Sequence, residues 1–292
     1  MAKCYLCPRE CGADRSLGEL GICGEGDGIR VARYSLHLWE EPPISGTRGS
    51  GTIFFSGCSL RCEFCQNRAI SHEGKGEPVS VERLAEMILE LEAQGAHNIN
   101  LVTPTHFADK VAEALHAIKD RLSIPVVYNT SGYEKVETLR LFEGLVDIYL
   151  PDYKYFSDEL ADKYSHAKDY RKNVEAALVE MYRQVGKPIF DENGLLKKGL
   201  VIRHLVLPTH RKDSMAVLDR ICEILPKEKI LVSLMSQYTP DFALTAGTPY
   251  RELHRRITTF EYSSVTEYAA SLGIDGFCQE KSSADAKFTP DF

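Results

Sequence analysis

Residues 52–67 read Thr-Ile-Phe-Phe-Ser-Gly-Cys-Ser-Leu-Arg-Cys-Glu-Phe-Cys-Gln-Asn. The stretch opens with a short apolar run typical of a buried strand, and three cysteines follow with the spacing Cys-x3-Cys-x2-Cys. Three thiolates on one loop, from Cys58, Cys62 and Cys65, suit a [4Fe–4S] cluster whose fourth iron has no protein ligand. An iron left open in this way is a position for a substrate or cofactor. A structural zinc site or a chance group of cysteines is the alternative.

The pattern around this stretch predicts alternating strands and helices. Five further apolar runs follow the strand 52–56, and amphipathic stripes beginning at Val81, Val111, Val174 and Val217 separate several of them. The further strand candidates are residues 98–102, 125–129, 147–150, 200–207 and 230–234. Alternation of this kind implies a parallel sheet, with functional residues at the carboxyl ends of its strands. Six units are too few for a closed barrel, so we expect an α/β fold, an open (β/α)6 partial TIM barrel.

Composition and charge narrow the class of protein. The chain has 292 residues, of which 43% are apolar, and a net charge of −7. A sizeable core is therefore expected, and broad nucleic-acid binding is unlikely for an acidic chain. The sequence has no apolar run long enough to span a membrane, and its first residues lack the apolar segment of a signal peptide. These features predict a cytoplasmic protein that does not bind membranes.

The first 48 residues differ from the rest, because they are rich in cysteine and glycine and show little periodicity. Cys4, Cys7, Cys11 and Cys23 lie within 20 residues, and a glycine follows two of them directly. So few apolar residues do not hold such a segment together without a cross-link. We expect residues 1–48 to form a small metal-binding module, with either zinc or a second iron–sulfur cluster, and residues 49–292 to form the partial barrel with a C-terminal helical tail.

The motif Cys58-x3-Cys62-x2-Cys65, with Phe64 before the last cysteine, resembles the signature of radical S-adenosylmethionine (SAM) enzymes. The likeness implies that the open iron binds SAM and that an electron cleaves it to methionine and a 5′-deoxyadenosyl radical. Residues 4–11, 39–46, 62–67 and 181–186 further resemble the group around the pyruvate formate-lyase activating enzyme. That group implies hydrogen abstraction from a protein or peptide and an electron donor such as flavodoxin or ferredoxin.

The same resemblance implies the residues that bind SAM. Phe64 occupies the position near the adenine, and the segments after the third, fourth and fifth strands resemble those that contact SAM and a monovalent cation. The residues carried over in this way are Asn129, Thr130, Ser131, Asp152, Lys154 and Arg203. The alternative for each is a polar strand end in solvent.

The chain departs from the activating enzymes after residues 98–102, where they carry a Gly-Gly-Glu stretch that receives the amino group of SAM. Here Thr103 and Thr105 are the candidate acceptors, and His106 is a candidate proton carrier at the mouth or a structural loop residue. The departure keeps other functions open. These are modification of a small molecule or an RNA, or a non-catalytic iron–sulfur or zinc scaffold.

Overall fold

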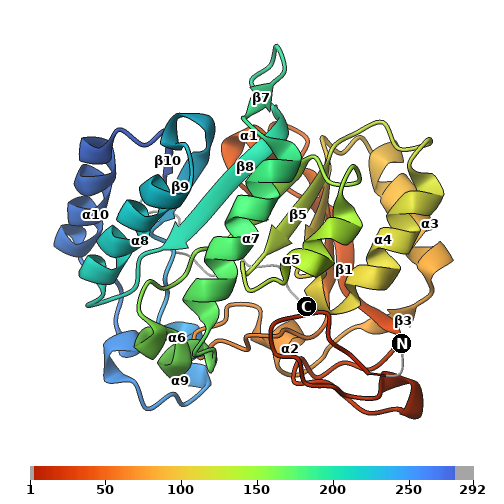
Figure 1. The fold of residues 1–292 in the computed structure, drawn as a ribbon, viewed down its shortest axis with the longest axis horizontal. Coiled ribbons are helices and arrows are strands. Elements are labelled where there is room, and N and C mark those ends of the chain that lie inside the picture. Colours follow the sequence, from red (N-terminus) through yellow and green to blue (C-terminus); the bar gives the residue numbers. More distant parts are fainter. Residues whose placement is uncertain (1–2, 280–292) are drawn as a thin grey trace.

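The computed structural model describes residues 3–279 and contains one mostly parallel sheet (Figure 1). The strand order is β10-β9-β8-β6-β5-β4-β2-β1-β3, and β7 pairs with β8 at the side. The parallel strands are β2 (Ser50–Phe55), β4 (Ile99–Val102), β5 (Val126–Thr130), β6 (Ile148–Pro151), β8 (Leu196–Leu205), β9 (Leu231–Met235) and β10 (Gly276–Cys278). The antiparallel strands are β1 (Ile29–His37), β3 (Glu77–Val79) and β7 (Ile189–Phe190). The end strands of this order are not paired with each other within residues 3–279, so the sheet is open.

All six predicted strands are present, which confirms the α/β class. Each of these six strands is followed by a helix, and β10 after α10 adds a seventh parallel strand beside β9, so the sheet is larger than the expected (β/α)6 arrangement. The boundary at residue 48 also changes. Strand β1 lies before it but pairs with β2 and β3, so the segment outside the sheet ends before Ile29. The end of the expected C-terminal tail, residues 280–292, lies outside the described residues.

The longer helices have the signals that the sequence predicts. The Ser80 side chain accepts a hydrogen bond from the Arg83 amide at the start of α3, and Gly186 ends α7. The helices are α1 (Pro42–Ser45), α2 (Arg68–Ser71), α3 (Val81–Ala93), α4 (Ala108–Ile118), α5 (Val136–Leu139), α6 (Asp158–Ser165), α7 (Tyr170–Val185), α8 (Arg211–Ile224), α9 (Asp241–Thr245) and α10 (Thr259–Leu272). Short 3-10 turns cover Arg15–Leu17, Thr105–Phe107, Arg140–Phe142, Lys227–Lys229 and Arg251–His254. No helix within residues 3–279 combines the length and the apolar character that crossing a membrane requires.

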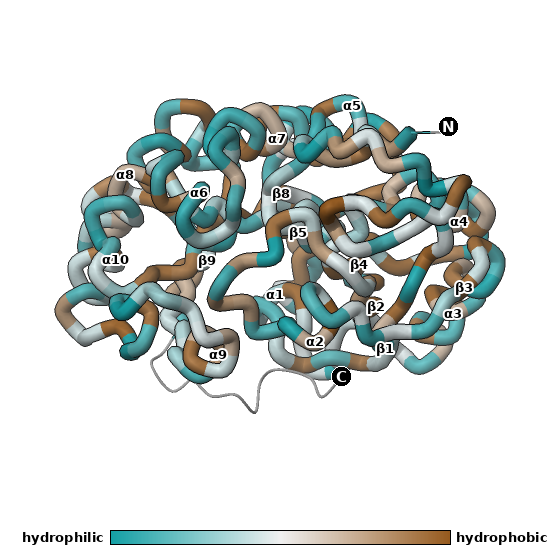
Figure 2. The backbone as a smooth tube through the Cα atoms, turned by 90° about the horizontal axis from the view of Figure 1, so that it is seen from below, coloured by the Kyte–Doolittle hydropathy of each residue, from teal (hydrophilic) through white to brown (hydrophobic). Residues whose placement is uncertain are grey.

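The two faces of the sheet are covered differently. Figure 2 shows α7 and α5 on one side of the strands and α1 and α2 on the other. On the first side lies the large apolar core. On the other side Ile44 of α1 packs in a small cluster with side chains of β5, β6, β8 and β9. The segment 39–46 therefore fills the inner side of the curved sheet, and the functional cavity lies beside it.

Candidate active site

The three-cysteine loop follows β2, and the N-terminal segment is hydrogen-bonded to it. The Cys58 amide donates a hydrogen bond of 3.1 Å to the carbonyl of Cys23. Gly57 makes this contact possible, because it has a φ of 79° and a Cβ there would lie 2.8 Å from that carbonyl oxygen. The sequence thus places the loop at a strand end, and the tertiary structure anchors it to a segment more than 30 residues away.

Each thiol of the loop accepts a hydrogen bond. The Leu60 amide donates to Cys58 Sγ (3.4 Å), Ser165 Oγ to Cys62 Sγ (2.9 Å) and Ser71 Oγ to Cys65 Sγ (3.2 Å). Burial raises the pKa of the Cys62 thiol, and it raises that of Cys65 to about 12. Hydrogen bonds to sulfur stabilise thiolates, and a bound metal displaces the thiol protons. The donor set fits an iron–sulfur cluster with one open iron.

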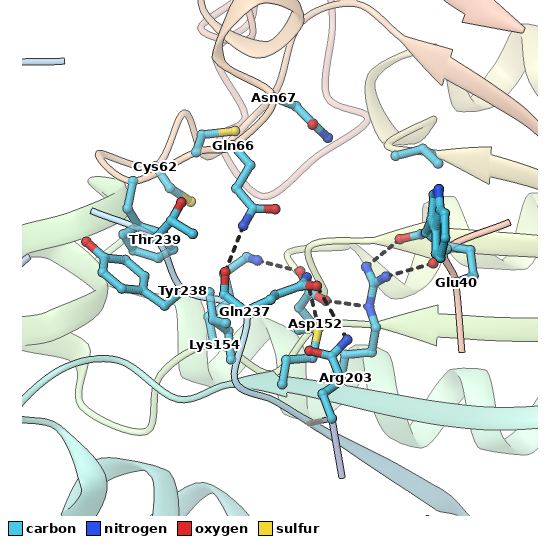
Figure 3. A pocket seen from close by; sticks show the side chains of 18 of the residues that line it. Glu40, Cys62, Gln66, Asn67, Asp152, Lys154, Arg203, Gln237, Tyr238 and Thr239 are labelled. Carbon is cyan, nitrogen blue, oxygen red and sulfur yellow. Dashed lines mark hydrogen bonds and ion pairs between the residues drawn. The ribbon is translucent and has the colours of Figure 1, made fainter. Parts of the chain in front are cut away.

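A cavity of about 240 Å³ lies between this loop and the carboxyl ends of the strands (Figure 3). Cys62, Phe64 and Cys65 line one side of it. The rest of the lining includes polar side chains from the ends of β5, β6, β8 and β9 and from the segment after β1. They are Glu40, Glu41, Asn129, Asp152, Lys154, Arg203, Gln237 and Thr239. The cavity therefore lies where the sequence predicts the site, at the carboxyl ends of the parallel strands.

Arg203 is the centre of the charged side of the cavity. Its Nε donates to Asp152 Oδ1 (2.8 Å), its Nη1 to Glu40 Oε2 (3.2 Å) and its Nη2 to Asn129 Oδ1 (2.6 Å). Lys154 Nζ donates to the other oxygen of Asp152. Figure 3 shows these side chains converging from separate strands and from the segment after β1. A guanidinium with three partners is fixed in orientation, which favours recognition of a carboxylate beside it.

Burial and charge act in opposite directions on these groups. Burial alone would raise the pKa of Asp152, but Arg203 and Lys154 hold it below its ordinary value. Burial raises the pKa of both Glu40 and Glu41, although Arg203 opposes it. Glu41 Oε2 is buried and has no hydrogen-bond partner within the described residues. The cavity thus holds a fixed ion-pair network next to Glu41, one carboxyl oxygen of which has no hydrogen-bond partner within the described residues.

Two of the predicted SAM contacts lie on the other side of the sheet. The hydroxyls of Thr105 and Thr130 both donate to Glu134 Oε1, and the first of these bonds is 2.5 Å long. Neither threonine lines the cavity. Burial raises the pKa of Glu134 to about 7, against the hydrogen bonds that it accepts. The structure therefore separates Thr105 and Thr130 from Asn129, Asp152, Lys154 and Arg203, which do line the cavity.

Thr103, Ser131 and His106 also lie away from the cavity. The Thr103 amide donates to the Asn129 carbonyl (2.8 Å), and the Ser131 carbonyl accepts from the Tyr170 hydroxyl (2.9 Å). His106 is buried, its Nε2 lies 2.6 Å from the Ser56 carbonyl, and burial lowers its pKa to about 4. The expected mouth position of His106 is wrong, because its ring packs beneath the loop instead of facing the cavity.

Sequence reasoning missed Glu40, Glu41 and Gln237 as cavity residues. Gln237 follows β9, and its carbonyl accepts a hydrogen bond of 3.2 Å from the Gln66 side chain, which joins the cysteine loop to the far strands. In the sequence, only the polar run after β9 could have indicated that Gln237 lies at the cavity. Glu40 and Glu41 belong to the segment 39–46, which was noted for its resemblance and not for a position in the site.

The sequence of this chain resembles those of known proteins. The sequence model of the radical SAM superfamily matches residues 52–197, which include the cysteine loop and the parallel strands β4, β5 and β6. The chain is 30% identical over 288 residues to the uncharacterized protein MJ0674 of Methanocaldococcus jannaschii, covering 93% of this chain and 75% of that protein.

Solved structures show weaker likeness. SuiB of Streptococcus suis bound to the precursor peptide SuiA has a TM-score of 0.49 and 13% identity, covering 76% of this chain and 46% of SuiB. Methylornithine synthase (PylB) has a TM-score of 0.42 and 13% identity, covering 76% of this chain and 68% of PylB. The chain thus spans about half the length of SuiB. With its family match over residues 52–197 and the cysteine loop at the cavity, the chain belongs to the radical SAM superfamily.

Proposed function

We propose that this protein is a radical SAM enzyme whose substrate is a protein or peptide, as in the activating enzymes of glycyl-radical enzymes. Cys58, Cys62 and Cys65 would hold the [4Fe–4S] cluster, and the cavity beside them would hold SAM. When both are bound, they supply a 5′-deoxyadenosyl radical that takes a hydrogen atom from the substrate. The observation that carries the proposal is the cavity, which has cysteines of the loop on one side and an ion-pair network on the other.

The charges of the cavity suit the two ends of an amino acid such as the methionine part of SAM. Arg203 and Lys154 present positive charge, which favours a carboxylate, and Glu41 offers an unpaired carboxylate oxygen to an ammonium group. Glu41 would then take the role that the missing Gly-Gly-Glu segment has in the activating enzymes. Asp152 holds Arg203 and Lys154 in place, and a monovalent cation beside it is part of the same proposal.

An aromatic group at the end of the cavity suits the adenine. The Phe64 ring is held edge-on by Tyr164 and Tyr238, at centroid distances of 6.3 and 6.0 Å. This packing fixes the ring that lines the cavity next to Cys65. The protein's contribution is to orient SAM and to exclude water from the reacting atoms.

The protein or peptide substrate rests on the resemblance of residues 4–11, 39–46, 62–67 and 181–186 to the activating enzymes. Direct modification of a small molecule is the second candidate, and an RNA or a non-catalytic scaffold is a further outcome of the test.

The first experiment measures 5′-deoxyadenosine after anaerobic reduction with dithionite in the presence of SAM. Wild-type protein should form it, and the triple variant Cys58→Ala/Cys62→Ala/Cys65→Ala should form none, because the three thiols are the only ligands that the loop offers. Cys222→Ser on α8 is the matched cysteine control and should retain activity. A fully clustered wild type without 5′-deoxyadenosine would show a scaffold.

The second experiment identifies the class of substrate. The reaction is run with extracts of deuterium-labelled cells that naturally make this protein, divided by size into macromolecules and small molecules. Deuterium should enter 5′-deoxyadenosine only from the macromolecular fraction, and protease but not ribonuclease should abolish it. Transfer from the small-molecule fraction would contradict the proposed protein substrate.

A further inference from the structure

The N-terminal segment, residues 3–28, buries two of its four cysteines and exposes several large apolar side chains. Cys7 and Cys23 are 7% and 4% exposed, whereas Leu17 and Leu20 are 79% and 66% exposed. The hydrophobic effect would favour the reverse arrangement. The segment is therefore not held together by an apolar core, and its inward side chains are thiols.

The turns of this segment present backbone amides to the sulfurs. The backbone amides of Arg9, Ala13 and Glu25, two residues after Cys7, Cys11 and Cys23, act to lower the pKa of the preceding thiol. In the loop at the cavity, the Leu60 amide donates to Cys58 Sγ, and the Asn67 amide acts in the same direction on the pKa of Cys65. The N-terminal segment thus repeats the local geometry of the loop that matches the superfamily motif.

The four N-terminal thiols converge without closing around one ion. The sulfurs of Cys11 and Cys23 lie within 3.5 Å of a common point, the position that a Cβ on Gly21 would take. Cys4 is close enough to Cys7 and Cys23 for their charges to interact. Yet within residues 3–279 no group of three potential ligands is arranged for a single metal ion.

The absence of a single-ion arrangement within residues 3–279 favours one of the two metals that the sequence left open. Four thiolates on zinc, with Zn–S bonds near 2.3 Å, lie only about 3.8 Å apart in a tetrahedron. A four-iron cluster inserts its own irons and sulfides between the thiolates and spaces them more widely. The loop with Cys58, Cys62 and Cys65, which belongs to a [4Fe–4S] superfamily motif, is equally absent from the single-ion arrangements. Neither of the two cysteine sets is therefore arranged for a single metal ion.

A direct contact joins the two sets. The Cys23 carbonyl accepts the hydrogen bond of the Cys58 amide, so a ligand of each set shares one hydrogen bond of 3.1 Å. Arg9 adds bonds to the Ser59 carbonyl (2.8 Å) and to the Ser165 carbonyl (2.7 Å), and Ser165 Oγ in turn donates to Cys62. The N-terminal segment is therefore fixed to the cavity loop through backbone and side-chain contacts at the cysteines themselves.

We propose that Cys4, Cys7, Cys11 and Cys23 hold a second [4Fe–4S] cluster, which passes electrons through the Cys23–Cys58 contact to the cluster at the cavity. The second cluster is reduced when it takes one electron from a low-potential donor of the flavodoxin or ferredoxin class. It returns to its oxidised state when it passes this electron to the cluster at the cavity. No proton or bond is exchanged. The existence of the cluster is independent of the proposed function, whereas its role as a relay rests on it.

The first test counts metals in anaerobically purified, reconstituted protein. Wild type should contain about eight irons per chain and the triple variant of Cys58, Cys62 and Cys65 about four, because one complete cluster remains. That variant keeps the N-terminal segment unchanged, so the result does not depend on the folding of an N-terminal variant. When reduced, it should give an electron paramagnetic resonance signal that SAM does not alter. One zinc with about four irons in the wild type, and no iron in the triple variant, would overturn the proposal.

The second test separates the relay from a structural role. In Cys7→Ser/Cys11→Ser, iron should fall to about four per chain. SAM cleavage driven by a reduced flavodoxin should fall more than tenfold, while cleavage driven by dithionite persists because this small reductant reaches the cavity cluster directly. Cys222→Ser is the control for both donors. Equal rates of flavodoxin-driven cleavage in the wild type and the double variant would overturn the relay. Loss of 5′-deoxyadenosine in the wild type itself would instead count against the proposed function.

Discussion

The two sides of strand β5 differ in what they contribute. Asn129 accepts a hydrogen bond from Arg203 on the cavity side, whereas Thr130, the next residue, donates to Glu134 on the side of the helices. Successive side chains of a strand point to opposite faces, so neighbours in the sequence belong to separate clusters. A polar residue at a strand end is thus a site residue only if its side chain lies on the cavity side of the sheet.

The neighbouring strands repeat the comparison. Asp152 and Lys154 line the cavity, while Tyr153 between them points outward and donates to Glu175 of α7 (3.1 Å). Arg203 lines the cavity, and His204 lies behind it with Nδ1 at 2.7 Å from the Tyr153 carbonyl. The inner cluster is an ion-pair network, and the outer cluster is formed by the hydrogen bonds of Thr105 and Thr130 to Glu134. The following changes test whether the two are functionally separate.

The largest effect is expected from Arg203→Met, which removes the centre of the inner cluster. Glu40 would lose its cation and Asp152 would keep only Lys154, and breaking a buried ion pair in this way costs about 3–5 kcal/mol. We expect SAM affinity to fall more than a hundredfold in equilibrium dialysis and stability to fall in urea unfolding. Arg203→Lys keeps the charge but cannot bind three partners, so it should recover stability better than SAM affinity. Unchanged SAM affinity in Arg203→Met would place SAM elsewhere.

Glu134, in the outer cluster, should make the stability of the protein depend on pH. The pKa of Glu134 is about 7 in the folded protein and 4.5 as its ordinary value, so the folded state binds the proton more tightly. Its contribution to stability is fully present below about pH 4.5 and is lost as the pH rises through about 7, a change on the order of 3 kcal/mol. Glu134→Gln removes this titration, so the difference in unfolding free energy between wild type and variant should change by that amount from pH 5 to pH 8. A constant difference would contradict the assignment.

The pair Asn129→Leu and Thr130→Val tests the alternation directly. Loss of the Asn129 partner leaves Arg203 Nη2 unsatisfied, which costs about 1–3 kcal/mol, or roughly tenfold to a hundredfold in SAM affinity. Thr130→Val should lower stability without changing SAM affinity, because its hydroxyl bonds to Glu134 and to the Gly132 amide and not to a cavity residue. Equal loss of SAM affinity in both variants would remove the distinction between the two sides.

The smallest effect is expected at Thr103, which directly follows β4 and has a φ of 60°. A β-branched residue is strained in this left-handed region, and glycine is not, so Thr103→Gly should be more stable by about 1 kcal/mol. SAM affinity should not change, since Thr103 does not line the cavity. Weaker SAM binding in this variant would restore the contact with the SAM amino group that the sequence suggested.

The local sequence was sufficient for the elements and for the cysteine motif. Short apolar runs and helical stripes located all six predicted strands and the helices α3, α4, α7 and α8, because burial and periodicity act over a few residues. Spacing alone was likewise enough to identify Cys58, Cys62 and Cys65. Strand β1 was missed, since its antiparallel pairing with β2 depends on residues far apart in the chain and its inner face carries few apolar residues.

Tertiary structure alone decided which strand-end residues share the cavity. Asn129, Asp152, Lys154 and Arg203 come together from three strands, while Thr105 and Thr130 turn to Glu134, because the register of the sheet and the pleat direct each side chain inward or outward. The sequence pattern placed all of them at strand ends and could not choose between the faces. Glu40 and Glu41 entered the cavity because α1 fills the inner side of the curved sheet, a long-range packing event that no local pattern encodes.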